Sequence, residues 1–258
     1  MNFFFAVLLS SALAGLAGYT KALTKGGILT AWILCIIISF FGGLPAFAIL
    51  TVTLLLVIAA DKLAGKRADP NGVRRKSGAR DAYRVLCNVA LPSIAIMIYG
   101  INGKDCFLFA YAAVMAESLS DSLASKLGPM TKGRTIDICT FREISPGLSG
   151  GISRAGSVAA FTGSLVIGAI SLAFGFGASE YALWVALLGF SGCLFDSLLG
   201  SVAQVKYICP ACGMVTERDS HCGEKTSICK GLKPINNDVV NLLSNGFVFL
   251  LSLLVFKV

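Results

Sequence analysis

The chain has 258 residues, of which 55% are hydrophobic and 14% are charged, and its mean hydropathy is +0.78. Soluble globular domains carry about 25% charged residues, so this composition excludes a soluble fold and indicates an integral membrane protein. The formal net charge of +8 comes from basic segments between apolar runs, and it therefore indicates membrane topology rather than nucleic-acid binding.

Apolar runs follow one another along the whole chain. A hydrocarbon core about 30 Å thick takes roughly 20 helical residues, because every backbone group must be paired inside it. The first run lacks a basic start, so we interpret it as a transmembrane helix and not as a signal peptide. The sequence predicts a single all-α domain, residues 1–258, that is a polytopic membrane helix bundle of about eight transmembrane helices. The runs lie at residues 3–20, 27–42, 44–60, 85–100, 106–124, 155–176, 180–200 and 237–256.

Lysine and arginine are concentrated in four segments between these runs. Of the 22 basic residues, two lie in residues 19–26, eight in 61–84, five in 125–154 and five in 201–235. Cytoplasmic loops retain positive charge, so these segments are predicted to face the cytoplasm. The protein is then a multi-pass protein of the cell membrane with both termini outside.

The segment of residues 201–235 is predicted to be a cytoplasmic, cysteine-rich insert. Cys209 and Cys212 form the motif C-P-A-C-G, and Cys222 and Cys229 follow. Two thiolates separated by two residues can bind one tetrahedral ion, so the four cysteines predict a structural zinc site, with His221 as an alternative ligand. Reduced thiols or redox chemistry remain the alternative, since a stable disulfide is disfavoured on a cytoplasmic face.

Four carboxylates lie within apolar runs, where a charge is costly and therefore indicates function. Glu117 and Asp121 lie four residues apart in the fifth run, on one helical face. Asp196 ends the seventh run, and Asp238 opens the eighth. All four fall at predicted cytoplasmic helix ends, so we predict a shared cluster of oxygen ligands for Mg²⁺. The alternative is that each carboxylate caps a helix or reaches the membrane surface.

A glycine- and serine-rich segment, residues 145–156, precedes the sixth run. Glycines allow backbone amides to converge, and the N-terminus of the following helix favours an anion. The segment predicts a phosphate-binding loop, although it is not a Walker A motif. Its candidate phosphate contacts are Ser149, Gly150, Gly151 and Ser153, with Arg142 and Arg154 as cationic partners. Arg84 and Asn88, one turn apart at the start of the fourth run, are further candidates.

Several motifs together resemble one membrane family. The most specific are S-D-S-L-A-S-K-L-G at residues 120–128, similar to A-D-T-x-A-S-E-x-G, and P-G-L-S-G-G-I-S at 146–153, similar to G-T-x-G-G-V-S. Further matches are G-A-R-D at 78–81 with R-V-L-C-N at 84–88, T-F-R at 140–142, D-S-L-L-G at 196–200 followed by Gln204, and N-N-D-V-V-N at 236–241. The chain resembles, over nearly its whole length, the membrane family of unknown function that includes transmembrane protein 19 and the plant phytyl-phosphate kinases. It departs from the family pattern at Lys126, where Glu is usual, and at Leu148, where Thr is common.

The resemblance implies Mg²⁺-dependent phosphoryl transfer from a nucleoside triphosphate, CTP or ATP, to an isoprenoid monophosphate at the cytoplasmic membrane surface. The partners expected are therefore a membrane lipid phosphate and a nucleotide, and no nucleic acid. Such a reaction needs metal, cationic clamps and positioning more than a covalent nucleophile. Two alternatives stay open: nucleotidyl transfer to a lipid phosphate, and a transporter or lipid carrier that uses the intramembrane carboxylates.

Overall fold

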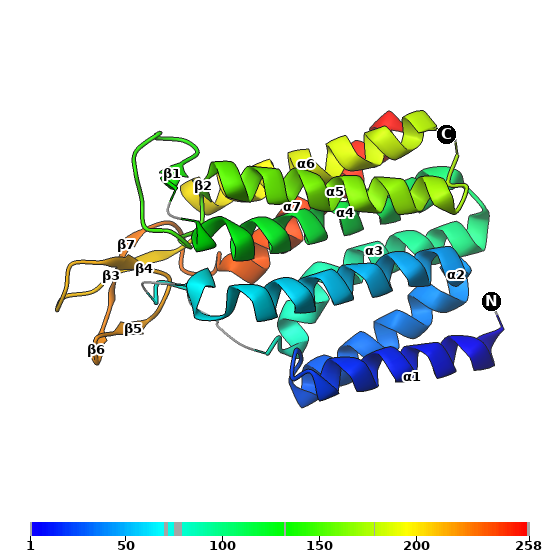
Figure 1. Ribbon diagram of the computed structural model, residues 1–258, viewed down its shortest axis with the longest axis horizontal. Helices are drawn as coiled ribbons and strands as arrows, with labels where there is room; N and C mark the ends of the chain where they lie inside the picture. Colours follow the sequence, from blue (N-terminus) through cyan, green and yellow to red (C-terminus); the bar gives the residue numbers. More distant parts are fainter. Residues whose placement is uncertain (1, 70–71, 75–78, 132, 178, 257–258) are drawn as a thin grey trace.

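Helices that run along one axis make up most of the computed structural model (Figure 1). The structure describes residues 2–69, 72–74, 79–131, 133–177 and 179–256. The α-helices in these residues are α1 (Phe3–Tyr19), α2 (Lys25–Ala64), α3 (Ala82–Asn102), α4 (Asp105–Leu127), α5 (Arg154–Ala173), α6 (Ser179–Val202) and α7 (Asn237–Val255), with short 3-10 helices at Gly65–Ala68 and Gly128–Met130.

The longest helix, α2, turns back on itself. A straight helix of 40 residues would be about 60 Å long. However, the Thr24 amide donates to the Arg80 carbonyl at 3.0 Å, and Arg80 Nη1 lies 3.1 Å from Asp61 Oδ2, so both ends of α2 meet the same residue. The reversal occurs at Gly43, whose φ of 66° and ψ of −160° leave helical geometry two residues before Pro45. Figure 1 shows the two arms of α2 meeting at this bend and both running back toward the strand-bearing end of the bundle.

The prediction of about eight transmembrane helices is wrong in its count, whereas the polytopic membrane bundle is confirmed. By length and composition, six helices in the described part of the chain can cross a membrane, and α1 is a shorter apolar helix of 17 residues. The difference arises at two places: α1 is shorter than the other spans, and the runs predicted at 27–42 and 44–60 are the two arms of the one bent helix α2.

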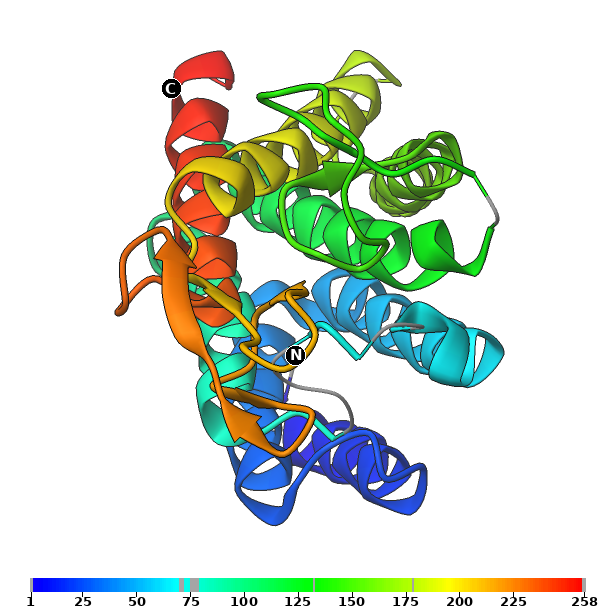
Figure 2. The same cartoon turned by 90° about the vertical axis from the view of Figure 1, so that its left-hand side faces the viewer.

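Short strands lie at the end of the bundle opposite both chain termini (Figures 1 and 2). The prediction of an all-α fold is therefore corrected to a mostly helical one. Strands of two to four residues carry too little alternation to be visible in sequence. The antiparallel pairs are β1 (Ile136–Asp137) with β2 (Gly151–Ile152), β3 (Lys206–Ile208) with both β4 (Val215–Thr216) and β7 (Ser227–Lys230), and β5 (Ser220–His221) with β6 (Glu224–Lys225).

The central helix of the bundle is α4. It packs against α2, α3, α5, α6 and α7, and 78% of its most apolar stretch is buried, compared with 33 to 44% in the other spans. Small side chains permit this central position, because Ala112, Ala113 and Ala116 are completely buried. Small residues let transmembrane helices approach closely, so α4 is surrounded by its neighbours along most of its length.

Two glycines bring α6 against α4. A Cβ atom added at Gly189 would lie 2.5 Å from the Ala116 Cβ, and one added at Gly192 would lie 2.5 Å from the Glu117 Cγ. Any larger residue at these positions would push the helices apart. Because Asp196 lies one turn beyond Gly192, this close packing places its carboxylate near Glu117.

We expect Gly192→Ala to lower the melting temperature of the detergent-solubilised protein. Overpacking costs about 1–3 kcal/mol, which exceeds the gain of up to about 1 kcal/mol in helix propensity. Gly246→Ala in α7 is the matched control, since nothing lies within 4 Å of an added Cβ there, and it should keep or raise the melting temperature. Equal melting temperatures for the two variants would contradict the close α4–α6 contact.

Candidate functional site

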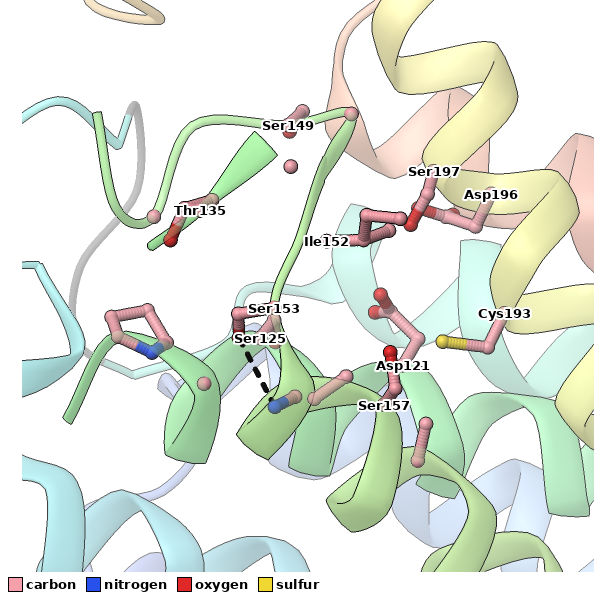
Figure 3. A pocket seen from close by; sticks show the side chains of 18 of the residues that line it. Asp121, Ser125, Thr135, Ser149, Ile152, Ser153, Ser157, Cys193, Asp196 and Ser197 are labelled. Atoms are coloured by element: carbon pink, nitrogen blue, oxygen red, sulfur yellow. Dashed lines mark hydrogen bonds between the residues drawn. The ribbon is translucent and has the colours of Figure 1, made fainter. Parts of the chain in front are cut away.

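A cavity opens at the strand-bearing end of the bundle, between α4, α5, α6 and the loop of residues 147–153 (Figure 3). It encloses about 720 Å³ of space, part of which is open solvent. The Asp121 carboxylate points into it from α4, and Asp196 lines the facing side on α6. We call it the glycine-loop cavity; it is also lined by Ser149, Gly150, Gly151, Ser153 and Asn237.

The glycine loop has a backbone that only glycine adopts easily. Gly147 and Gly150 have φ values of 88° and 84°, and a Cβ at Gly150 would lie 2.6 Å from the backbone of Ser201. At the end of the loop, Ser153 caps α5 by accepting a hydrogen bond from the Gly156 amide at 3.1 Å. The loop thus brings backbone amides and hydroxyls to a helix N-terminus, which is a favourable environment for an anion.

Two of the predicted carboxylates share one hydroxyl inside the bundle. Ser244 Oγ lies 2.7 Å from Glu117 Oε1 and 3.3 Å from Asp196 Oδ2, and both carboxylate residues are buried. A hydroxyl has one proton, so it can donate to only one of them at a time. The negative charge left over in this interior can be offset by a proton or a bound cation.

On its other side, Asp121 lines a second, smaller pocket that we call the basic pocket. This pocket is lined by Arg74, Arg80, Arg84, Asn88 and Lys126 as well. Some of its charges are already paired. Arg80 Nη1 lies 3.1 Å from Asp61 Oδ2, Lys126 Nζ contacts the other oxygen of Asp61, and Arg84 Nε lies 3.9 Å from Asp238 Oδ1.

A row of asparagines connects the basic pocket with the glycine loop. Asn241 on α7 meets Asn88 on α3, with Nδ2 of Asn241 lying 3.2 Å from Oδ1 of Asn88. Asn237 Nδ2 donates to Asn241 Oδ1 at 3.3 Å, and Ser149 Oγ donates to Asn237 Oδ1 at 3.4 Å. In its opposite amide orientation Asn241 donates instead to Asp196 Oδ2 at 3.1 Å. These amides can therefore donate to a carboxylate or accept from a cation, according to their orientation.

The structure brings most of the predicted site residues to one end of the bundle, although not into one cluster. Asp121, Asp196 and the loop residues line the glycine-loop cavity, whereas Arg84 and Asn88 line the basic pocket. Glu117 lies one turn below Asp121, and Asp238 pairs with Arg84. Arg142 and Arg154 are exposed and line neither space, and their predicted phosphate contacts stay predictions.

Several residues of this end were missed in the sequence. Ser244 continues a polar stripe on α7 that begins with Asn237 and Asn241, and a search for polar residues at helical spacing could have found it. Arg74 lies in a basic segment that the sequence assigns to topology, Arg80 appears there only within the G-A-R-D motif, and Asp61 was not identified. Nothing local in the sequence indicates their pairing, because Lys126 and Asp61 are 65 residues apart.

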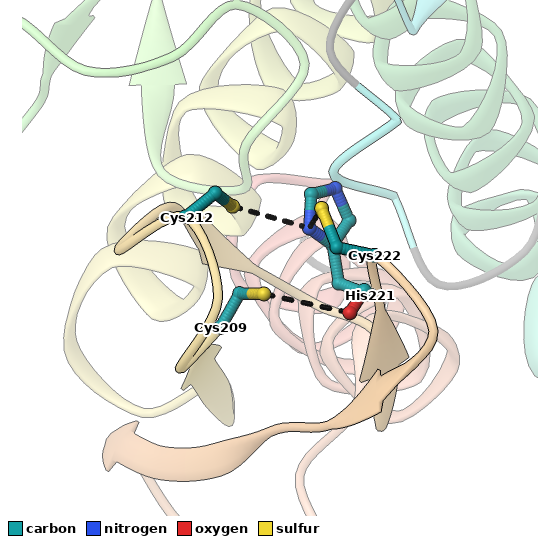
Figure 4. Close-up of side chains that lie close together, drawn as sticks. All are labelled: Cys209, Cys212, His221 and Cys222. Atoms are coloured by element: carbon teal, nitrogen blue, oxygen red, sulfur yellow. Dashed lines mark hydrogen bonds between the residues drawn. The ribbon is translucent and has the colours of Figure 1, made fainter.

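A separate group of sulfur and nitrogen atoms lies in the sheet that follows α6 (Figure 4). Cys209, Cys212, His221 and Cys222 each offer a ligand atom, and these atoms all lie within 4.8 Å of one another. The Cys212 and Cys222 sulfurs lie 3.5 Å and 3.3 Å from His221 Nδ1. Three thiolates and one imidazole are a common donor set for tetrahedral zinc, so the group could hold such an ion.

The fourth ligand of this group is His221, and Cys229, which was predicted, lies outside it on β7. The reason is a tight turn between β5 and β6. Its two residues, Cys222 and Gly223, have φ values of 54° and 81°, as in the type I′ hairpin turn. This turn presents His221 and Cys222 together to the C-x-x-C loop.

The surroundings of the Cys209 thiol lower its pKa. Burial raises its pKa, but hydrogen bonds from the Cys212 backbone and the His221 side chain outweigh this effect and lower the pKa to about 7. The thiolate is the form that binds a metal, so this environment is consistent with a metal ligand.

The cysteine-bearing sheet also contacts the glycine loop. Glu217 follows β4, and its Oε1 accepts a hydrogen bond from the Ser149 amide at 2.8 Å. Its neighbour Arg218 donates from Nε to the Arg74 carbonyl at 2.8 Å and reaches Asp69 Oδ2 with Nη2 at 3.3 Å. The sheet therefore holds both the glycine loop and the segment that supplies Arg74 to the basic pocket.

Together, the fold and these sites define a polytopic membrane protein with a polar site at one end of its helix bundle and, beside it, a cysteine and histidine cluster that could hold a metal ion. The chain belongs to the family described as integral membrane protein DUF92, whose model matches residues 8–249. The resemblance inferred from the sequence motifs is thereby confirmed.

Relatives of the chain come from plants, archaea and cyanobacteria. It is 29% identical over 267 residues to Protein PGR of Arabidopsis thaliana, which covers 93% of this chain and 91% of that protein. It is 28% identical over 214 residues to an uncharacterised membrane protein of Methanocaldococcus jannaschii, covering 81% and 86% of the two chains, and 26% identical over 208 residues to one of Synechocystis, covering 78% and 81%. No solved structure matches the chain. None of these descriptions names a reaction.

We expect the purified protein to contain about one zinc ion per chain, measured by inductively coupled plasma mass spectrometry. His221→Ala should lose this zinc, because it removes one of the four clustered ligands. Cys229→Ser is the matched control and should keep it, since Cys229 lies outside the cluster on β7. The opposite result, with zinc lost in Cys229→Ser and kept in His221→Ala, would restore the ligand set predicted from the sequence.

Proposed function

We propose that the protein is an isoprenoid-phosphate kinase, which transfers a phosphoryl group from a nucleoside triphosphate to an isoprenoid monophosphate. The observation that carries the proposal is the position of Asp121, which lines both the glycine-loop cavity and the basic pocket. A carboxylate that borders both spaces could hold a Mg²⁺ ion between two bound phosphates, and metal and positioning are what phosphoryl transfer needs.

The glycine-loop cavity is proposed to bind the triphosphate donor. The Ser149 and Ser153 side chains line this open space at the N-terminus of α5. A helix N-terminus carries a positive partial charge and favours a phosphate. Arg142 and Arg154 lie near the loop and are exposed, so they are available to a nucleotide that enters from the aqueous side.

The basic pocket is proposed to bind the acceptor phosphate. Arg74 and Arg84 line it, and both can make paired hydrogen bonds to a phosphate. The attacking oxygen belongs to a phosphate that is already anionic, so no strong general base is needed. It forms a bond to the γ-phosphorus while the bond from that phosphorus to the bridging oxygen breaks, and the nucleoside diphosphate leaves.

The carboxylates fit Mg²⁺ as the metal of this reaction. Asp121 and Asp196 line the same cavity, and the buried residues Glu117 and Asp196 share the Ser244 hydroxyl, which carries no charge that could neutralise them. Among the described residues, the close grouping of three or more ligands is found in the cysteine cluster and not among these carboxylates. This suits Mg²⁺, which takes one or two carboxylates and completes its shell with water and phosphate oxygens. Bound there, it would neutralise charge on the phosphates.

The membrane orientation follows from the positive charges. The basic segments gather at the end of the bundle that carries the strands, opposite both termini (Figure 1). Cytoplasmic loops retain lysine and arginine, so this end is proposed to face the cytoplasm, where nucleoside triphosphates are found.

The proposal is tested by incubating detergent-purified protein with γ-labelled ATP or CTP and phytyl, geranylgeranyl or undecaprenyl phosphate, with and without Mg²⁺. We expect labelled lipid diphosphate from the wild type, and a loss of about 100-fold or more in Asp121→Asn and Asp196→Asn. Asp105→Asn is the matched control, because Asp105 lies exposed in the first turn of the same helix as Asp121.

The same assay with α-labelled nucleotide separates the kinase from nucleotidyl transfer. A kinase leaves the α-label in the released nucleotide, whereas nucleotidyl transfer places it in the lipid and releases pyrophosphate. Absence of labelled lipid with both nucleotides, from protein that is folded and binds zinc, would contradict both reactions and leave the carboxylates to a transport or carrier role.

A further inference from the structure

A second large cavity lies on the other side of α4, between α1, both arms of α2, and α3. It encloses about 870 Å³ of space, part of which is open to the surroundings, and its walls are mainly aliphatic. Figure 2 shows α1 and α2 on one side of the bundle and α5 and α6 on the other, so this apolar cavity and the glycine-loop cavity are separated by the central helix. Its walls include Leu13, Leu50, Leu54, Val57, Val89 and Met115.

The apolar cavity ends at the basic pocket. Arg80, Arg84, Asn88 and Ser122 line both spaces. On α4, the apolar cavity is lined by Met115 and Ser118, and the basic pocket begins one turn further on, at Asp121 and Ser122. The combined space has an apolar body and a cationic mouth, which is the polarity of a molecule with a hydrocarbon chain and an anionic head.

The depth of the cavity matches one leaflet of a membrane. On α4 its walls run from Met115 to Ser122, and on α2 from Leu50 to Val57. Seven residues of helix span about 10 Å, and Asp61, which pairs with Arg80 at the mouth, lies one further turn along α2. The resulting depth of about 15 Å equals half of a hydrocarbon core that is about 30 Å thick.

We propose that the apolar cavity holds the isoprenoid chain of the lipid phosphate, with its phosphate in the basic pocket beside Arg84, which lines both spaces. This inference rests on the proposed function for the identity of the phosphate head. The chain would enter from one leaflet, and the phosphate would stop at the mouth because the cavity beyond it offers aliphatic walls. The occupant's phosphate is thereby placed on the face of α4 opposite the glycine loop, with Asp121 between the two phosphates.

The test is a binding measurement made without nucleotide, so that it does not depend on the reaction. Labelled geranylgeranyl phosphate is titrated against the full-length protein in detergent, and dimethylallyl phosphate is the short-chain probe. Leu54→Trp fills the cavity from α2, and Leu55→Trp is the matched control, because Leu55 is 44% exposed and does not line the cavity.

We expect Leu54→Trp to weaken binding of geranylgeranyl phosphate by about tenfold or more, to leave dimethylallyl phosphate unaffected, and Leu55→Trp to match the wild type. A second pair approaches from α1: Ala14→Phe on the cavity wall should behave like Leu54→Trp, and Ala12→Phe on the exposed face like the wild type. Zinc content and a single size-exclusion peak identify the variants that are folded.

Equal binding by all folded variants would overturn the cavity assignment, whatever the reaction. Binding of a diacyl phosphatidate as tight as that of geranylgeranyl phosphate, with the same loss in Leu54→Trp, would overturn the isoprenoid assignment and identify an ordinary membrane lipid. If geranylgeranyl phosphate binds and Leu54→Trp weakens it while no phosphate is transferred, the proposed reaction fails and the cavity assignment stands.

Discussion

The close packing of α6 against α4 is the constraint on which the polar end of the molecule depends. Glycines at 189 and 192 leave no room for a side chain between the two helices, and Asp196 is therefore held within reach of the hydroxyl that also contacts Glu117. Two buried carboxylates in a low-dielectric interior require either a bound proton or a counter-charge. A cation bound at this end would neutralise the buried carboxylates, and it would also supply the metal ion that the proposed reaction needs.

The positive side chains around Asp121 are arranged by a second set of pairings. Lys126, at which the chain departs from the motif that it resembles, contacts Asp61 on α2. Asp61 also pairs with Arg80, so these three side chains form a partly buried network at the mouth of the apolar cavity. Arg74 and Arg84 also line the space that faces Asp121. Lysine at this position adds a positive charge to the pocket, and the contact with Asp61 partly offsets it.

The strands β3 to β7, which carry the cysteine cluster, have no hydrophobic core of their own. Short strands bury little apolar surface, and a bound metal supplies folding free energy to such segments. The sheet in turn positions Glu217 on the Ser149 amide and Arg218 on the Arg74 carbonyl. A metal ion in the cluster would therefore act on the site at a distance, by fixing the two loops that border it.

The sequence by itself determined the membrane class, the positions of the apolar runs, the family and the carboxylates at the ends of the helices. Hydropathy and charge distribution are local properties of a chain in lipid, so they are readable without a structure. Only the tertiary structure decided how these elements meet. The bend at Gly43 joins the predicted runs at 27–42 and 44–60 into one reversed helix, and the turn at Cys222 and Gly223 places His221, rather than Cys229, beside Cys209 and Cys212. Ser244 and Glu117 meet although 127 residues separate them, because helix packing creates contacts that no local pattern contains.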